Sequence, residues 1–235
     1  TATGINVSGI TNTNGTITAV VAASCTATTG TVRFQVSDGS LTATGDLTVN
    51  VTANTAPSLA YSNVSVNSGS STSNSPTTAN DNGSITSYSL QSVGSYTGGI
   101  SVNASGVVSI TAAAPVGVHT ITVRATDNCG TTTDASFTIN VGNNGPSIAP
   151  AATLIRQRGT SASVSIIATV NDNETAAGNL IVTATTVPAG ISIASITNNN
   201  GTVSANIAAA CAAALGNNTV VLTVTDENGG TATGN

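Results

Sequence analysis

The sequence predicts an all-β chain, built from tandem β-sandwich modules in an elongated array. Two observations lead to this prediction. The chain repeats part of itself, and short runs of alternating aliphatic and hydroxyl residues are separated by turn signals. The composition agrees, because hydrophobic residues reach 39% and only 6% of residues are charged, which is too apolar for a disordered chain.

The repeat relates the two ends of the chain. Residues 4–17 (GINVSGITNTNGTI) match residues 190–203 (GISIASITNNNGTV) at an offset of 186. The same offset carries Cys25 onto Cys211. A divergent module that follows the same plan lies between the two copies. The repeat therefore predicts an array of similar units along one chain.

Two short polar stretches, ending in Pro57 and Pro146, have the composition of linkers. We therefore predict three modules. Residues 1–56 form the rear part of a first module, residues 57–143 a complete module, and residues 144–235 a third module that lacks its last strand.

Alternation with a period of two predicts the strands. Val32, Phe34 and Val36 alternate with polar residues, and Ile121 and Val123 do the same in the second module. Such alternation points one set of side chains inward and the other toward solvent. A module of about 90 residues with this punctuation predicts an immunoglobulin-like sandwich of about seven strands.

The stretch from Gly99 to Asp127 reads GISVNASGVVSI…GVHTITVRATD. It resembles the cadherin-like, hyalin-like and immunoglobulin-like repeats of microbial surface proteins. The resemblance covers all three modules and is strongest over their second halves. It implies an immunoglobulin-like fold and an extracellular or cell-surface location, and it specifies no activity.

Three cysteines are present, Cys25, Cys129 and Cys211. In an immunoglobulin-like module, Cys25 precedes the sixth strand and Cys129 lies in the turn that follows that strand in the next module. Stacking modules end to end brings these two positions together, so we predict a Cys25–Cys129 disulfide between modules. Cys211 would then pair with the next module or subunit. Three separate buried thiols are the alternative.

Most of the few carboxylates lie in loops at one pole of each module. The candidate metal ligands are Asp81, Asp127, Asp172, Glu174, Asp226 and Glu227. Ca²⁺ prefers such oxygen ligands, and the cadherin-like resemblance implies calcium at the joints between modules. The same residue types also favour turns through local hydrogen bonds, so both interpretations stand. No cofactor is required, and calcium is the one candidate.

The end of the third module predicts a site of assembly. Asn235 corresponds to Asp46, after which the first module continues into a strand. A sandwich without that strand exposes an apolar groove and unpaired backbone, which favours strand addition. We therefore expect a strand-exchange interface involving Leu47, Val49 and Val51, unless the chain is an excerpt of a longer array.

The composition narrows the functional classes. With no lysine, the chain lacks the basic face of a nucleic-acid binder, and no apolar run is long enough for a membrane span. No catalytic residues are predicted, and the one histidine, His119, is expected at a surface or half-buried position. The chain is predicted to be no enzyme but a structural component of an extracellular filament, sheath or surface layer, with itself as partner. The alternatives are an adhesin that binds glycan or protein through loop tips, and a non-catalytic spacer of a secreted enzyme.

Overall fold

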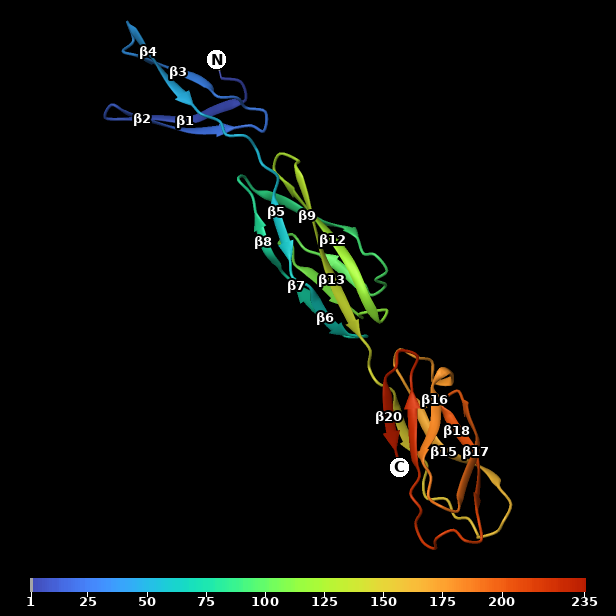
Figure 1. Ribbon diagram of the computed structural model, residues 1–235. Helices are drawn as coiled ribbons and strands as arrows, with labels where there is room; N and C mark the ends of the chain where they lie inside the picture. Colours follow the sequence, from blue (N-terminus) through green and yellow to red (C-terminus); the bar gives the residue numbers. More distant parts are fainter. Residues whose placement is uncertain (1) are drawn as a thin grey trace.

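The computed structural model describes residues 2–235, and the fold is all-β. Over this range there is no α-helix, and the one helical turn is the 3₁₀ turn η1 (Ala177–Asn179). Figure 1 shows three groups of strands that follow one another in an elongated row. Every strand pairs only with strands of its own group. We call the groups the N-terminal segment (β1–β4), the middle segment (β5–β13) and the C-terminal segment (β14–β20).

The middle segment is a sandwich. One layer is a four-stranded sheet in the order β6-β13-β12-β9, and the other combines the sheet β10-β11-β7 with the pair β5-β8. The strand β6 runs parallel to β13, and all other pairs are antiparallel. The strands are β5 (Ser58–Tyr61), β6 (Val64–Asn67), β7 (Thr72–Asn74), β8 (Pro76–Asn80), β9 (Ile85–Ser92), β10 (Gly99–Val102), β11 (Val108–Thr111), β12 (Gly117–Asp127) and β13 (Thr132–Gly142).

The core of the middle segment follows from the alternation along its two longest strands. Ile121 and Val123 of β12 and Ile139 of β13 have no exposed surface, and Phe137 is 2% exposed. The polar residues between them face outward, because successive side chains of a strand point to opposite faces. The alternation predicted from the sequence is thus present in the structure, and it closes an immunoglobulin-like pair of layers.

The C-terminal segment has the same two-layer plan. One sheet has the order β14-β15-β18-β17 and the other the order β16-β19-β20. Val203 and Val224 have no exposed surface in its core. The strands are β14 (Ser147–Pro150), β15 (Ser163–Asn171), β16 (Ile181–Thr186), β17 (Ile191–Asn199), β18 (Thr202–Ala209), β19 (Val221–Thr225) and β20 (Thr231–Gly234).

The C-terminal segment contains a strand, β20, after the turn that follows β19, at a place where the sequence analysis expected the last strand to be lacking. β20 pairs with β19 from Leu222 to Thr225. The matching strand of the N-terminal segment, β4, begins at Thr42, well before Leu47. The repeated residues TATG therefore form a strand in both segments. The domain boundaries at residues 56 and 143 remain a prediction.

The N-terminal segment consists of two hairpins, β1 (Ile5–Thr13) with β2 (Thr16–Ala23) and β3 (Gly30–Ser37) with β4 (Thr42–Val49). These strands match β17–β20 of the repeat. No counterparts of β14–β16 cover them among residues 2–235, and the effect on burial is direct. Ile17 is 50% exposed where the matching Val203 is fully buried, and Val36 is 51% exposed where Val224 is fully buried.

Candidate functional site

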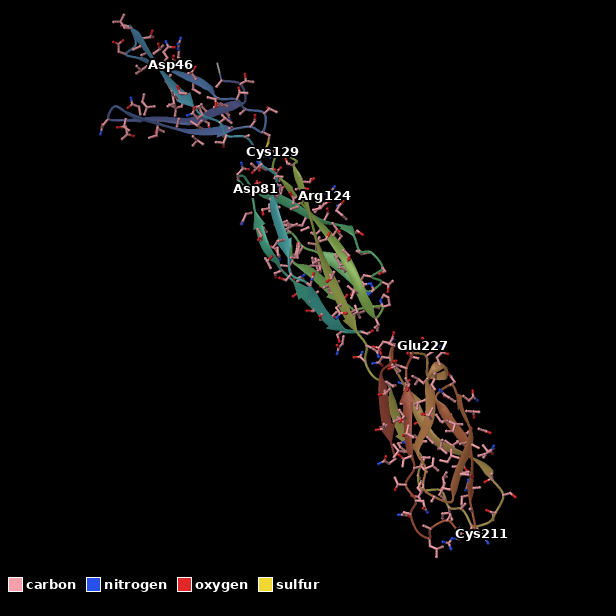
Figure 2. The ribbon with its side chains drawn as sticks, in the orientation of Figure 1. Asp46, Asp81, Arg124, Cys129, Cys211 and Glu227 are labelled. Atoms are coloured by element: carbon pink, nitrogen blue, oxygen red, sulfur yellow. A yellow bond between two sulfur atoms is a disulfide. The ribbon has the colours of Figure 1, made fainter. Side chains whose placement is uncertain are left out.

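The joint between the N-terminal and middle segments contains a disulfide. Cys25 lies in the turn after β2, Cys129 lies in the turn between β12 and β13, and their sulfur atoms are 2.06 Å apart. The two Cα atoms are 5.4 Å apart across 104 residues of sequence. Figure 2 shows Cys129 at this joint. The bond joins the two cysteines for which end-to-end stacking of modules predicts a disulfide. It links the turn after β2 in the N-terminal segment to the β12–β13 turn of the middle segment.

Hydrogen bonds fasten the linker at the same joint. The side-chain amide of Asn54 donates to Asp127 Oδ2 at 2.8 Å and to Thr131 Oγ1 at 3.0 Å. The amide of Asn82 donates to the carbonyl oxygen of Ala53 at 3.0 Å. The linker residues on either side of Asn54 are therefore held against two loops of the middle segment.

Asp127 organises the turn that carries Cys129. The residue is 2% exposed, and its Oδ1 accepts hydrogen bonds from the backbone N–H groups of Cys129 and Thr131, each at 2.8 Å. The hydrogen bond from Asn54 is the largest cause that lowers the pKa of Asp127, and it outweighs the opposing effect of burial. Asp127 thus acts as a turn residue whose oxygens are already occupied.

The joint between the middle and C-terminal segments repeats this arrangement without a disulfide. Asn143 donates to Asp226 Oδ2 at 2.8 Å, and Asp226 Oδ1 accepts the N–H groups of Asn228 and Gly230, each at 2.8 Å. Burial raises the pKa of Asp226, but the hydrogen bonds from Asn143 and from the turn backbone outweigh it and leave the pKa below its usual value. Asn54 and Asn143 therefore play the same part in the two joints.

Asn144 adds a bridge across the second joint. Its amide donates to the carbonyl oxygen of Ser68 at 3.0 Å and also to Glu174 Oε1. Ser68 belongs to the middle segment and Glu174 to the C-terminal segment. A single side chain thus connects both neighbours of the linker. Neither Asn54, Asn143 nor Asn144 was singled out from the sequence, although Asn54 and Asn143 each stand three residues before the proline that ends the linker.

Four oxygen atoms at these joints are buried without a hydrogen-bond partner. Asp81 Oδ1 lies at the first joint, and Asn143 Oδ1, Asp172 Oδ1 and Glu174 Oε2 lie at the second. Buried oxygens of this kind fit a hard cation such as Ca²⁺. Among residues 2–235 no group of three or more His, Cys, Asp or Glu side chains is arranged to hold a metal ion. A calcium ion at the second joint would therefore need amide and water oxygens as well.

The structure divides the predicted calcium ligands into two kinds. Asp127 and Asp226 use both of their oxygens within the joints, and Glu227 accepts a hydrogen bond from Asn179 at 2.8 Å. Asp81, Asp172 and Glu174 each keep one buried free oxygen. The turn interpretation thus accounts for the first kind, and the second kind forms the stronger candidate set for a cation.

The other predicted residues lie away from the joints. Cys211 is exposed and unpaired within residues 2–235, in the turn after β18 at the far end of the C-terminal segment (Figure 2). Leu47 and Val49 lie on β4, and Val51 follows it. Leu47 is 46% exposed.

His119 differs from the prediction of a surface or half-buried position. It is 4% exposed, its Nδ1 lies 2.8 Å from Ser95 Oγ, and its Nε2 lies 2.8 Å from the carbonyl oxygen of Pro115. The ring also packs edge-on against Tyr96, with centroids 5.7 Å apart. Strand alternation places this position of β12 inward, and the two hydrogen bonds satisfy the ring, so His119 has a structural role.

No family model matches the chain, and no curated protein matches it in sequence. Among solved structures, extracellular cadherin domains 1–4 of protocadherin gamma B7 are 15% identical, with 99% of this chain and 66% of that chain covered and a TM-score of 0.39. The human desmocollin-1 ectodomain is 14% identical, with 99% and 48% covered and a TM-score of 0.35. An endo-fucoidan hydrolase of glycoside hydrolase family 107 is 14% identical, with 99% and 38% covered and a TM-score of 0.34.

The chain thus spans about two fifths to two thirds of the length of these structures. Likeness at these TM-scores carries no conclusion about this chain, and the fold assignment rests on the order and pairing of its own strands. Within residues 2–235, no helix is both long enough and apolar enough to cross a bilayer.

Proposed function

We propose that the chain is a structural, non-catalytic part of an extracellular polymer, such as a filament, sheath or surface layer, made of stacked immunoglobulin-like units. The observation that carries this proposal is that both linkers are bonded to their neighbours. Cys25–Cys129 and Asn54 fasten the first joint, and Asn143 and Asn144 fasten the second. A bonded linker holds adjacent units in one orientation, which a load-bearing rod requires. A disulfide at such a joint also suits an oxidising, extracellular compartment.

Small-angle X-ray scattering of the whole chain tests the stiffness of the joints. A rod gives one narrow distribution of maximum dimension, whereas flexible linkers give a broad one. We expect the Asn143→Ala/Asn144→Ala double variant to broaden the distribution. The Asn228→Ala variant is the matched control, because only its backbone N–H takes part in the second joint. A wild-type chain that already scatters as a flexible string of beads would contradict the proposal.

The polymer is proposed to continue through Cys211, which holds the position of Cys25 in the repeat. Cys25 pairs with the turn of the following unit, so Cys211 is proposed to pair with the corresponding turn of the next unit or subunit. Mass spectrometry of native material digested without reductant tests this. A peptide containing Cys211 linked to a second cysteine supports the proposal, and alkylation of Cys211 as a free thiol in that material argues against it.

Calcium is proposed to stiffen the second joint by binding the buried free oxygens of Asp172, Glu174 and Asn143. The ion would supply positive charge to two carboxylates that lie close to the linker. Isothermal titration of calcium into the wild-type chain should release heat, and the Asp172→Asn/Glu174→Gln variant should lose that heat. Asp134→Asn is the control, because Asp134 pairs with Arg124 on an exposed strand. Titration of the wild type without heat, and without a change in melting temperature, would remove calcium from the proposal.

A further inference from the structure

Five asparagines of the chain are followed directly by glycine, namely Asn14, Asn82, Asn144, Asn200 and Asn228. In this dipeptide the asparagine side chain is open to attack by the next backbone nitrogen, because glycine has no Cβ that hinders the approach. The attack converts the asparagine into aspartate or isoaspartate without an enzyme. Which of the five sites reacts depends on whether the glycine N–H is free.

The reaction has two steps. The glycine nitrogen gives up its proton to water and forms a bond with Cγ of the asparagine. The Cγ–Nδ2 bond breaks, and the side-chain nitrogen takes up a proton from water and leaves as ammonia. Water then opens the cyclic imide at either carbonyl carbon, which yields aspartate or isoaspartate. The first step requires a glycine nitrogen that can turn toward Cγ and is not engaged as a hydrogen-bond donor.

In four of the five sites the glycine N–H already donates a hydrogen bond. The bonds run from Gly15 to Asn12 Oδ1 (3.0 Å), from Gly83 to Asp81 Oδ2 (2.8 Å), from Gly201 to Asn198 Oδ1 (2.9 Å) and from Gly229 to the carbonyl oxygen of Asp226 (3.4 Å). Each bond must break before the nitrogen can attack. The bond of Gly229 is the longest, so Asn228 is the least protected of these four sites.

Gly145 differs from the other four glycines. Among residues 2–235 its N–H has no hydrogen-bond partner, and the residue is exposed in the linker between β13 and β14. A Cβ added at Gly145 would meet only the carbonyl oxygen of Thr231, at 3.7 Å, so little is packed against this part of the linker. Of the five sites, Asn144 is therefore the one with a free attacking nitrogen.

Asn82 is the internal comparison for Asn144, because the two side chains are held alike. The Asn82 amide donates to a carbonyl oxygen of the first linker, and the Asn144 amide donates to acceptors on both sides of the second joint. Both amides must leave such bonds in order to react. The two sites differ in the next nitrogen, which is bonded in Gly83 and free in Gly145.

We propose that Asn144 is a site of spontaneous deamidation, and that its conversion loosens the second joint. The product replaces an N–H donor group by a carboxylate, which only accepts hydrogen bonds. This carboxylate faces the carbonyl oxygen of Ser68 and the carboxylate of Glu174, whose Oε2 is already buried without a partner. Like charges at this distance repel, and isoaspartate also lengthens the backbone of the linker. The bridge across the second joint is therefore lost as the protein ages.

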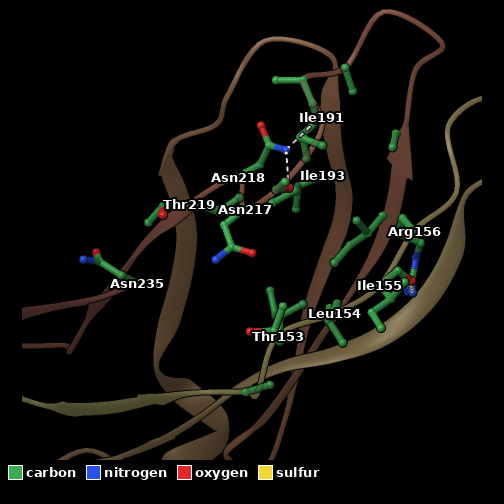
Figure 3. Close-up of a pocket in the computed structure, with 18 of the residues that line it drawn as sticks. Thr153, Leu154, Ile155, Arg156, Ile191, Ile193, Asn217, Asn218, Thr219 and Asn235 are labelled. Carbon is green, nitrogen blue, oxygen red and sulfur yellow. Dashed lines mark hydrogen bonds between the residues drawn. The ribbon is translucent and has the colours of Figure 1, made fainter.

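Asparagines that are not followed by glycine provide the background rate. Asn54 at the first joint precedes Thr55, whose Cβ hinders the attack. Exposure alone does not create a site either. Asn217 is exposed at an open cavity of about 580 Å³ in the C-terminal segment (Figure 3), but Asn218 follows it and carries a side chain. The first joint is therefore expected to keep its linker asparagine while the second loses its own.

Peptide mapping by mass spectrometry tests the site on the whole chain, residues 1–235. The protein is incubated for weeks at mildly alkaline pH in heavy-oxygen water, with a chelator present so that the result does not depend on calcium. We expect Asn144 to take up heavy oxygen and to convert at least about twofold faster than Asn82, because the hydrogen bond of Gly83 must break first. A smaller difference between Asn144 and Asn82 overturns the site.

Gly145→Ala is the variant that slows the reaction without altering the amide of Asn144. The added Cβ has room, and the backbone of Gly145 is not in the left-handed region. We expect small-angle scattering of the aged wild type to give a broader distribution of maximum dimension than the fresh protein. Aged Gly145→Ala should keep the fresh distribution.

Asn144→Asp represents the product and should reproduce the broad distribution without incubation. If Asn144→Asp scatters like the fresh wild type, the loosening is refuted. The mass measurement does not depend on the stiffness of the joints. A fresh wild-type chain that is already flexible would therefore contradict the proposed function and leave the deamidation site to be judged by the conversion rates.

Discussion

Removal of the inter-segment disulfide should destabilise the N-terminal segment far more than the other two. The variant Cys129→Ser breaks the bond to Cys25 but keeps a small polar side chain in the turn. When the N-terminal segment unfolds and the middle segment stays folded, the disulfide closes a loop of about 30 residues, from Cys25 to the point where Asn54 is fixed. In the chain-entropy account, such a loop is worth about 3 to 4 kcal/mol. That free energy is a large share of the stability of the N-terminal segment, because its strands β1–β4 leave much of their aliphatic surface exposed.

Hydrogen exchange followed by mass spectrometry measures this loss region by region. We expect the amides of β1–β4 to exchange up to roughly 300-fold faster in Cys129→Ser, since about 1.4 kcal/mol corresponds to a factor of ten. The amides of β12 and β13 should change little. Cys211→Ser is the matched control and should leave β1–β4 unaffected. If β1–β4 keep their protection within about threefold in Cys129→Ser, the loop-closure reasoning is wrong.

Further predictions concern burial and charge. Val203→Ala should lower the free energy of unfolding by about 2 to 3 kcal/mol, whereas the repeat-matched Ile17→Ala should lower it by less than about 1 kcal/mol, as measured by urea denaturation. The pKa of Asp127 lies below its ordinary value, so its contribution to stability is present above about pH 3.9 and is lost as the pH falls through the lower, folded-state pKa. Asn54→Ala removes the largest cause of that shift and should raise the pKa of Asp127, as seen in an NMR titration of the carboxyl carbon.

Much of the fold could be predicted from the sequence because the strand signal is periodic and local. Alternation along residues 117–127 and 132–142 specifies which side chains are inward, and the buried set of β12 and β13 follows it. The pairing of Cys25 with Cys129 could be predicted because it depends on the order of strands in each module and on the end-to-end stacking of modules. It needs no knowledge of side-chain detail.

The polar bonds of the joints could not be predicted in the same way. Asn54, Asn143 and Asn144 stand in a sequence rich in asparagine, and composition does not separate a bridging asparagine from a turn asparagine. Their role depends on which loops the fold brings to one pole. The start of β20 could not be predicted for a different reason. Alternation of aliphatic and polar residues begins at Leu47, which predicts a strand from there, but β4 begins at Thr42 because its ladder with β3 extends almost to the turn.

The two joints show how a chain with few charges can still fix its geometry. Each joint uses one buried aspartate whose Oδ1 orders a turn and whose Oδ2 receives a linker asparagine. Because the aspartate is already committed to its turn, the linker asparagine meets a preformed acceptor and little freedom remains to be lost on docking. The remaining difference is that the first joint adds a covalent bond, whereas the second adds Asn144 and has three of the four buried free oxygens. The first joint should therefore respond to reductant and the second to ionic conditions, so the two ends of the middle segment can be loosened independently.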